Sequence, residues 1–137
     1  IYYSVENNTI GEASLISIQD YGEQNIEGYF LSDIGNKRKG FNTTHKTKLA
    51  ACAKFKNLVE MNRLTISSRS LISELKNFVA HGTSYAAKPG ETDDLVMAML
   101  LVVRMMKVLQ SYHGELDGQM TDHEDQRIEP MPFVAMF

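Results

Sequence analysis

Two adjacent carboxylates, Asp93 and Asp94, stand directly before the longest apolar run of the chain, which covers residues 95–103. Charged side chains are rarely buried without a partner, so two acids at the start of a core helix need an explanation. One acid there would cap free backbone N–H groups and complement the helix dipole, a gain of about 0.3 to 1 kcal/mol. A second acid beside it adds repulsion unless a cation holds it. Because carboxylate oxygens are hard ligands and no Cys or His cluster accompanies them, the pair indicates Mg²⁺ or Mn²⁺.

Glu6 is the companion that we expect for this pair. It stands where the first predicted strand meets a loop and a helix, and sites in α/β proteins form at such sheet edges. A strand-end carboxylate that faces the N-terminus of a helix on the same sheet suits metal-dependent hydrolysis of phosphodiesters. The alternative remains open that Glu6 is an ordinary surface residue and that the two Asp residues serve only as caps.

A basic segment is the second feature that could do chemistry. Eight of the fourteen Lys and Arg residues lie between Lys37 and Arg63, with Glu60 as the one acid among them. A loop of cations leading into a helix N-terminus suits phosphate oxygens, which makes the segment a candidate surface for a polyanion such as DNA, with contact to the backbone and no recognition of bases. The alternative is that these cations form an ordinary solvent-exposed face. The candidates are Lys37, Arg38, Lys39, Lys46 and Lys48, followed by Lys54 and Lys56.

Composition limits the class of protein. A chain of 137 residues with 43% apolar side chains is long enough for one domain with its own core. Cys52 is the single cysteine, which excludes an internal disulfide and is typical of a reducing cytoplasm. The apolar run at residues 95–103 is much shorter than the roughly 20 residues that cross a bilayer, and the first residues do not resemble an export signal. We therefore expect a soluble protein without a membrane segment.

Strand and helix patterns alternate along the chain. Strands are predicted at residues 2–5, 26–31 and 64–66. Three helices are predicted before the apolar run: from an Asn7 or Asn8 cap to Gly22, from a Thr43 or Thr44 cap to about Met61, and from a Ser67 or Ser68 cap to His81 and Gly82. Residues 83–91 are predicted as an extended edge piece followed by a turn. Such alternation is typical of an α/β fold in which helices flank a sheet.

The last predicted helix begins at the acid pair and ends near Tyr112, ahead of Gly114. Because its first turns are apolar on all sides, neighbouring elements are expected to cover most of it. The sequence thus divides into a domain at residues 1–113 and a tail at residues 114–137. The tail is an acidic linker that ends in the apolar segment "PMPFVAMF", which either covers the domain itself or docks on a partner.

Four motifs in this order resemble the C-terminal nuclease domain of the large terminase subunit of tailed bacteriophages. They are "VENNTIGEASL", "GFNTTHKTK", "SSRSLISELKNFV" and "GETDDLVMAML", and the resemblance extends from residue 1 to about residue 107. It implies a ribonuclease-H-like fold, with a mixed β-sheet flanked by helices, and an endonuclease that cuts double-stranded concatemeric DNA with two Mg²⁺ or Mn²⁺ ions. It also implies work in the bacterial cytoplasm at the procapsid portal, with the portal and the small terminase subunit as partners.

Carried over residue by residue, Glu6 matches the second acid of that family, and Asp93 or Asp94 matches the third. The family's first acid lies on a strand upstream of the Glu strand, and nothing precedes Ile1 here. The phosphate loop of the family's motor domain is also absent from the sequence. We therefore expect a nuclease domain that lacks its first strands and has reduced activity in isolation. Two alternatives remain: a non-catalytic DNA-binding or assembly module of the same fold, and a structure-selective resolvase.

Overall fold

The structure is a computed structural model that describes the backbone of residues 1–127 and the side chains of residues 1–114. Residues 128–137, which include the apolar end of the predicted tail, lie outside the described residues. The described chain is a mixed α/β protein, as predicted. Its elements are β1 (Tyr2–Tyr3), α1 (Thr9–Tyr21), η1 (Glu23–Asn25), β2 (Tyr29–Phe30), α2 (His45–Glu60), α3 (Arg69–Asn77), β3 (Phe78–His81), β4 (Ser84–Ala87) and α4 (Asp94–Arg127).

The strands form two separate two-stranded sheets instead of one mixed sheet. Strands β1 and β2 pair in parallel, with Tyr2 opposite Tyr29, and a single bridge between Glu6 and Phe41 continues the pairing. Strands β3 and β4 form an antiparallel hairpin that turns at residues 82–83. The predicted sheet flanked by helices is therefore not found as one sheet in the described part of the chain. The ribonuclease-H-like fold remains a prediction.

Several predicted boundaries were correct because capping residues mark them. Asn8 accepts the Gly11 N–H at the start of α1, and Ser68 accepts the Leu71 N–H at the start of α3. Thr44 and Thr47 form a capping box at the start of α2. Two other predictions were wrong. Residues 64–66 form no strand, and the third helix ends at Asn77, so that Phe78 and Val79 belong to β3.

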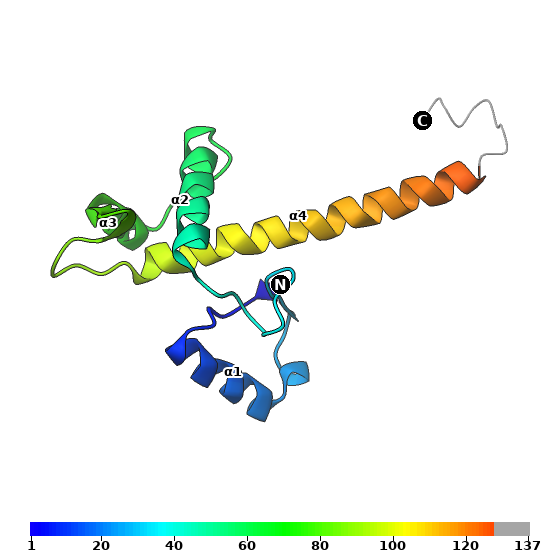
Figure 1. Cartoon of the computed structure of the whole chain (residues 1–137), viewed down its shortest axis with the longest axis horizontal. Coiled ribbons are helices and arrows are strands. Elements are labelled where there is room, and N and C mark those ends of the chain that lie inside the picture. The colour runs from blue at the N-terminus through cyan, green and yellow to red at the C-terminus, as the bar shows by residue number, and fades with distance from the viewer. Residues whose placement is uncertain (128–137) are drawn as a thin grey trace.

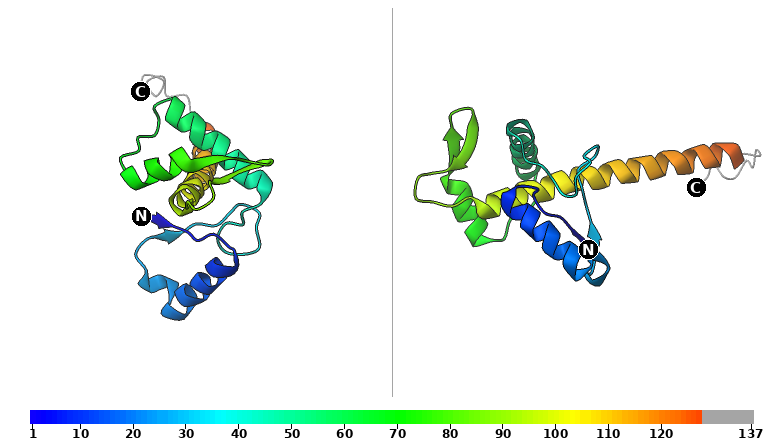
Figure 2. Two further views of the ribbon diagram at one scale, coloured as in Figure 1. Left: turned by 90° about the vertical axis from the view of Figure 1, so that its left-hand side faces the viewer. Right: turned by 60° about the horizontal axis from the view of Figure 1, so that its bottom comes forward.

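Helix α4 is the long axis of the molecule. Figure 1 shows α2 and α3 against one side of its N-terminal half, while α1 and the β1–β2 pair lie on the opposite side. The left view of Figure 2 shows the same arrangement, with α1 below α4 and with α2 and α3 above it. The helix passes Tyr112 and Gly114 and continues to Arg127, so the predicted end near Tyr112 was wrong. Its C-terminal half extends beyond the other elements.

Helix α4 contributes to two hydrophobic cores. Val96, Leu100 and Val103 pack with side chains of α2 and α3, including Phe55 and Leu71. The second core contains Met105 and Val108 of α4 and two residues of the N-terminal part, Leu31 and Phe41. Two apolar stripes on different sides of one helix explain why its sequence is apolar almost all round.

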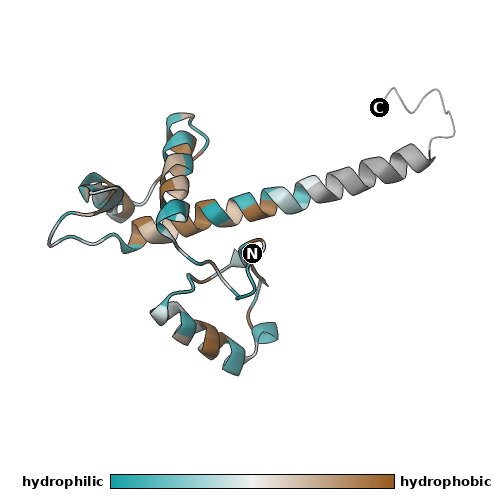
Figure 3. Cartoon of the chain, viewed as in Figure 1, coloured by the Kyte–Doolittle hydropathy of each residue, from teal (hydrophilic) through white to brown (hydrophobic). Residues whose placement is uncertain are grey.

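A third side of α4 stays open to solvent. Leu95 and Val102, which are seven residues apart and hence on the same side, are 42% and 43% exposed. In Figure 3 the hydrophobic colour covers much of the first turns of α4. The expectation that neighbours cover most of α4 is therefore correct for two sides and wrong for this one.

The segment Asp94–Gly114 is long and apolar enough to cross a membrane by length and composition alone. The core helix of a soluble protein passes the same test, and three of its residues, Val96, Leu100 and Val103, belong to the core shared with α2 and α3. The segment is therefore weak evidence for a membrane span.

Candidate metal and phosphate site

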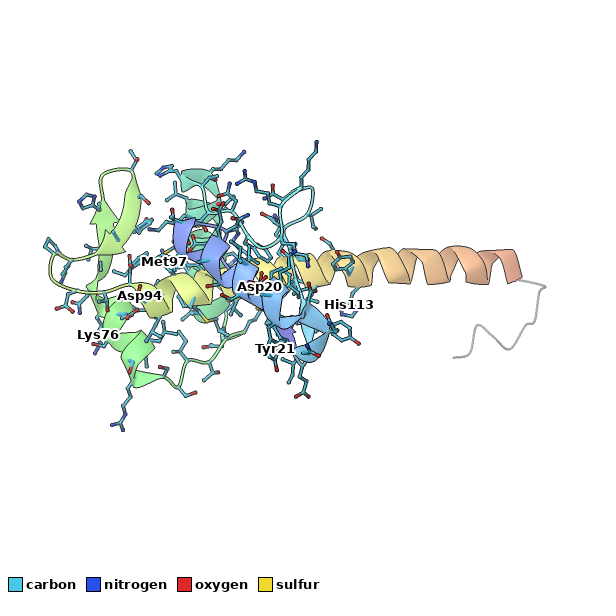
Figure 4. The ribbon with its side chains drawn as sticks, turned by 90° about the horizontal axis from the view of Figure 1, so that it is seen from below. Asp20, Tyr21, Lys76, Asp94, Met97 and His113 are labelled. Carbon is cyan, nitrogen blue, oxygen red and sulfur yellow. The ribbon has the colours of Figure 1, made fainter. Side chains whose placement is uncertain are left out.

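Glu6 and Asp94 line one cavity of about 370 Å³ although they are separated by most of the chain. Glu6 comes from the end of the extended N-terminal segment, and Asp94 is the first residue of α4. Figure 4 labels Asp94 at the start of that helix and Met97 one turn further along. Lys48 of α2 and Arg104 of α4 also line this cavity, and the Lys48 ammonium lies over the Phe78 ring, 5.7 Å from its centre. Two carboxylates and two cations in one hollow form a site that can hold a cation and an anionic group together.

The backbone around Glu6 is held on both sides. The Phe41 N–H donates to the Val5 carbonyl at 3.0 Å, and the Asn7 N–H donates to the Phe41 carbonyl at 2.7 Å. Phe41 itself is fully buried, at 0% exposure, so this strand pairing is anchored in the second core. The Asn8 side chain donates to a Glu6 carboxylate oxygen at 3.3 Å. The half-buried Glu6 therefore has a fixed backbone and one side-chain contact that restricts its direction.

Gly11 allows α1 to begin directly against Glu6. A Cβ atom at position 11 would lie 1.6 Å from the Glu6 carbonyl oxygen, a distance at which atoms overlap. Gly11 is also the one buried residue of α1. The sequence signal, a glycine in the first turn of a helix, indicates only a slightly weaker helix. The structure assigns it a packing role beside the candidate site.

Asp93 and Asp94 have different surroundings. One carboxylate oxygen of Asp93 accepts the Ala87 N–H at 3.3 Å, and its carbonyl accepts the Met97 N–H of α4. Asp93 thus ties the end of the β3–β4 hairpin to the start of the helix. Asp94 is exposed and lines the cavity with Glu6. The sequence leaves open which member of the pair shares a site with Glu6, and in the structure only Asp94 lines the cavity that Glu6 lines.

Neither Asp side chain caps the first N–H groups of α4. Glu74 of α3 does so instead, since one of its carboxylate oxygens accepts the Leu95 N–H at 2.8 Å and the Val96 N–H at 3.1 Å. Its other oxygen accepts the Thr92 hydroxyl at 3.0 Å. A carboxylate at a helix N-terminus satisfies free donors and complements the dipole. This capping by another helix leaves the Asp94 carboxylate available for the cavity.

The Glu74→Ala change is expected to destabilise the fold by about 1 to 3 kcal/mol, because two backbone N–H groups of α4 lose their acceptor. Glu74→Gln keeps one oxygen acceptor and should lose less than half of that. Urea unfolding followed by circular dichroism measures both values. Equal stability of all three proteins would contradict the capping role.

Arg104 is the most firmly held cation of the site. It donates to Asp33 at 2.8 Å, to the Thr43 hydroxyl at 3.2 Å and to the Asn42 carbonyl at 3.0 Å, and it lies over the Phe41 ring. Its side chain is only 12% exposed. Sequence reasoning missed it, although a lone Arg directly after the apolar run was a signal that a buried partner exists.

The structure places the cationic residues of the basic segment in different surroundings. Arg38 pairs with Glu12 of α1 at 3.4 Å, and Lys39 pairs with Glu23, so these predicted DNA contacts are already engaged by acids. Lys37 lines a separate polar pocket beside Asn7. Lys46 is exposed in the first turn of α2, and Lys48 reaches the cavity of Glu6 and Asp94. Of the five main candidates, only Lys48 therefore lines the cavity of Glu6 and Asp94.

Burial raises the pKa of the Cys52 thiol, although the nearby Lys48 ammonium and a backbone hydrogen bond act in the opposite direction. Because the thiolate is the reactive form, Cys52 should be alkylated by iodoacetamide only slowly at neutral pH. Its rate should rise at higher pH than that of a cysteine in a short peptide. Lys48→Ala removes the cation that favours the thiolate and should move this profile to still higher pH. A profile at or below that of the peptide would contradict the assignment.

The donor set fits part of a site for a hard divalent cation. In the part of the chain whose side chains are described, no group of three or more His, Cys, Asp or Glu residues is placed to hold a metal ion. The two carboxylates in the cavity are hard oxygen ligands of the kind that Mg²⁺ and Mn²⁺ take, and such ions complete their shell with water and phosphate oxygens.

No protein family model matches this sequence.

Proposed function

We propose that this chain is part of a metal-dependent endonuclease that hydrolyses phosphodiester bonds of double-stranded DNA. The observation that carries the proposal is that Glu6 and Asp94 line the same cavity, together with Lys48 and Arg104. Carboxylates suit a divalent cation, and adjacent cationic side chains suit the phosphate on which such a cation acts. The motif resemblance to the terminase nuclease domain supports the same assignment.

The residues of the site have distinct roles in this proposal. Glu6 and Asp94 hold Mg²⁺ or Mn²⁺, which when bound activates water and stabilises charge on the departing oxygen. Lys48 attracts the scissile phosphate into the cavity. Arg104 adds positive charge at the wall and keeps the segment before α2 in place through Asp33, Thr43 and Asn42. Asp93 and Glu74 fix the start of α4 and thereby the direction of Asp94.

The terminase resemblance extends the proposal to the cellular setting. It implies two metal ions in the complete site, a third acid on a strand encoded ahead of the Glu6 strand, and cutting of concatemeric DNA during packaging. The portal and the small terminase subunit are the proposed partners, and the procapsid portal in the bacterial cytoplasm is the proposed place of action.

Cleavage of supercoiled plasmid tests this function. The protein is assayed both as this chain and together with the residues encoded ahead of Ile1, in Mg²⁺, in Mn²⁺ and in EDTA. We expect metal-dependent nicking that Glu6→Gln and Asp94→Asn abolish, and stronger activity in the longer protein. Equal cleavage of branched and linear DNA supports the packaging nuclease, whereas strong preference for branched DNA would indicate a resolvase.

A non-catalytic DNA-binding or assembly module is the second candidate. It is favoured by the finding that, among the side chains that the structure describes, only two acids gather at the site. DNA binding without cleavage by the longer protein in any metal would establish this module and exclude the nuclease.

A further inference from the structure

A second cavity adjoins the candidate site. It has a volume of about 540 Å³ and shares two wall residues, Ala51 and Arg104, with the cavity of Glu6 and Asp94. Its other walls come from α2, from the middle of α4 and from the loop at residues 33–34. Because Arg104 lies between them, the two hollows form adjacent compartments along the crossing of α2 and α4.

This second cavity is cationic. Lys54 of α2 and Lys107 of α4 both line it, and both side chains are exposed. Among the described side chains, no carboxylate lies within ion-pair distance of either lysine. Asp33 is the one acid in the lining, and Arg104 already neutralises it at 2.8 Å. The cavity therefore carries an uncompensated positive charge of two lysines.

The distribution of ion pairs distinguishes this surface from the basic loop ahead of α2. The loop cations Arg38 and Lys39 are paired with Glu12 and Glu23, and binding a phosphate there would first break those pairs. Lys54 and Lys107 have no such competitor among residues 1–114. An open hollow with long, mobile ammonium groups suits a phosphate backbone that continues past it better than an enclosed small anion.

We propose that the second cavity, which we call the α2–α4 groove, binds DNA backbone phosphates through Lys54 and Lys107. These phosphates are the neighbours of the phosphate that binds in the cavity of Glu6 and Asp94. The DNA strand then continues from the cavity of Glu6 and Asp94 past Arg104 along α4, and not over residues 37–39. This inference rests on the proposed function, because DNA is taken as the ligand of the site. It assigns a role to Lys107, which lies outside the basic segment of the sequence.

Salt-dependent binding of a DNA duplex tests the groove. Fluorescence anisotropy is measured in EDTA over a range of NaCl concentrations, so that neither metal nor cleavage affects the result. Each lost phosphate contact lowers the slope of log affinity against log salt by about 0.9, so the Lys54→Ala, Lys107→Ala double variant should lower it by about 1.8. The matched control replaces Lys76 and Lys88, two exposed lysines that line neither cavity and pair with no acid among the described side chains, and should leave the slope unchanged.

The loop variant Lys37→Ala, Arg38→Ala, Lys39→Ala separates the two paths. A smaller change in slope for this variant than for the groove variant supports the groove, and the reverse order would overturn it. An unchanged slope in the groove variant, with normal circular dichroism, would also overturn it. Failure of the proposed function has a different signature, since it leaves this binding result intact while the longer protein cuts no DNA in any metal.

Discussion

Replacing either acid of the cavity should remove most of the Mn²⁺ affinity of the chain. Glu6→Gln and Asp94→Asn each delete one of the two proposed charged oxygen ligands while nearly preserving side-chain volume. Changes to residues that only orient a metal ligand typically lower affinity by about 10- to 100-fold, and loss of a ligand should reach or exceed the upper end of that range. Calorimetric titration of the chain with Mn²⁺ measures the effect without any assay of cleavage.

Asp93→Asn is the matched control for Asp94→Asn, because it removes the same charge from the neighbouring residue. An Asn side chain at position 93 retains an oxygen that can accept the Ala87 N–H, so the hairpin contact survives. We expect Mn²⁺ affinity close to that of the unaltered chain. If both variants lost the same Mn²⁺ affinity, the total charge of the two Asp residues would decide the affinity, and not the position of Asp94 in the cavity. That result would contradict the proposed site.

The second large effect is expected at Gly11. Gly11→Ala places a methyl group 1.6 Å from the Glu6 carbonyl, so α1 or the Glu6 backbone must move. Overpacking of this kind typically lowers the free energy of unfolding by about 1 to 3 kcal/mol, and contact with rigid backbone favours the upper value. The displaced Glu6 should also bind Mn²⁺ more weakly. Urea unfolding and the same calorimetric titration measure the two losses.

Gly114→Ala is the matched control for Gly11→Ala, and we expect it to change the free energy of unfolding in the opposite direction. Gly114 lies inside α4, and a Cβ added there meets no atom within 4 Å. Alanine should stabilise the helix by about 0.5 to 1 kcal/mol, with no change in metal affinity. If Gly11→Ala were as harmless as Gly114→Ala, the close contact between α1 and Glu6 would be excluded.

Helix starts were predictable from sequence because the capping residues act locally. Asn8, Thr44 and Ser68 each bind a backbone N–H three residues later in the chain, so no tertiary information is needed. Helix ends were less predictable. Gly114 looked like a stop signal, yet a glycine inside a helix costs only about 1 kcal/mol, and α4 continues through it.

Only half of the hairpin was predicted: the extended piece expected within residues 83–91 is β4, whereas β3 was missed. Phe78 and Val79 are apolar residues at a spacing that suits the preceding helix, and their pairing with β4 depends on residues 84–87. Short apolar runs do not distinguish helix from strand by periodicity. The same limit applies to residues 64–66, where β-branched and apolar residues occur without a partner strand in the described part of the chain.

The candidate site was predictable in its residue types and only partly in its geometry. Glu6 and the Asp pair were identified from sequence, and the structure brings Glu6 and Asp94 to one cavity. The separate role of Asp93 depends on the Ala87 N–H, and the freedom of Asp94 depends on Glu74. Both partners come from elements whose position relative to α4 is a property of the folded chain, which no local pattern encodes.

The course of α4 through both cores has a consequence for how the molecule comes apart. Residues ahead of α2 pack on one side of α4, and residues of α2 and α3 pack on another side. If α4 unfolds locally, the apolar side chains of both groups become exposed to water. The amide hydrogen of Phe41 and those in α3 should consequently exchange with solvent through a shared opening of α4. Because α4 is shared by both cores, we expect the part of the chain that the structure describes to unfold in one cooperative transition.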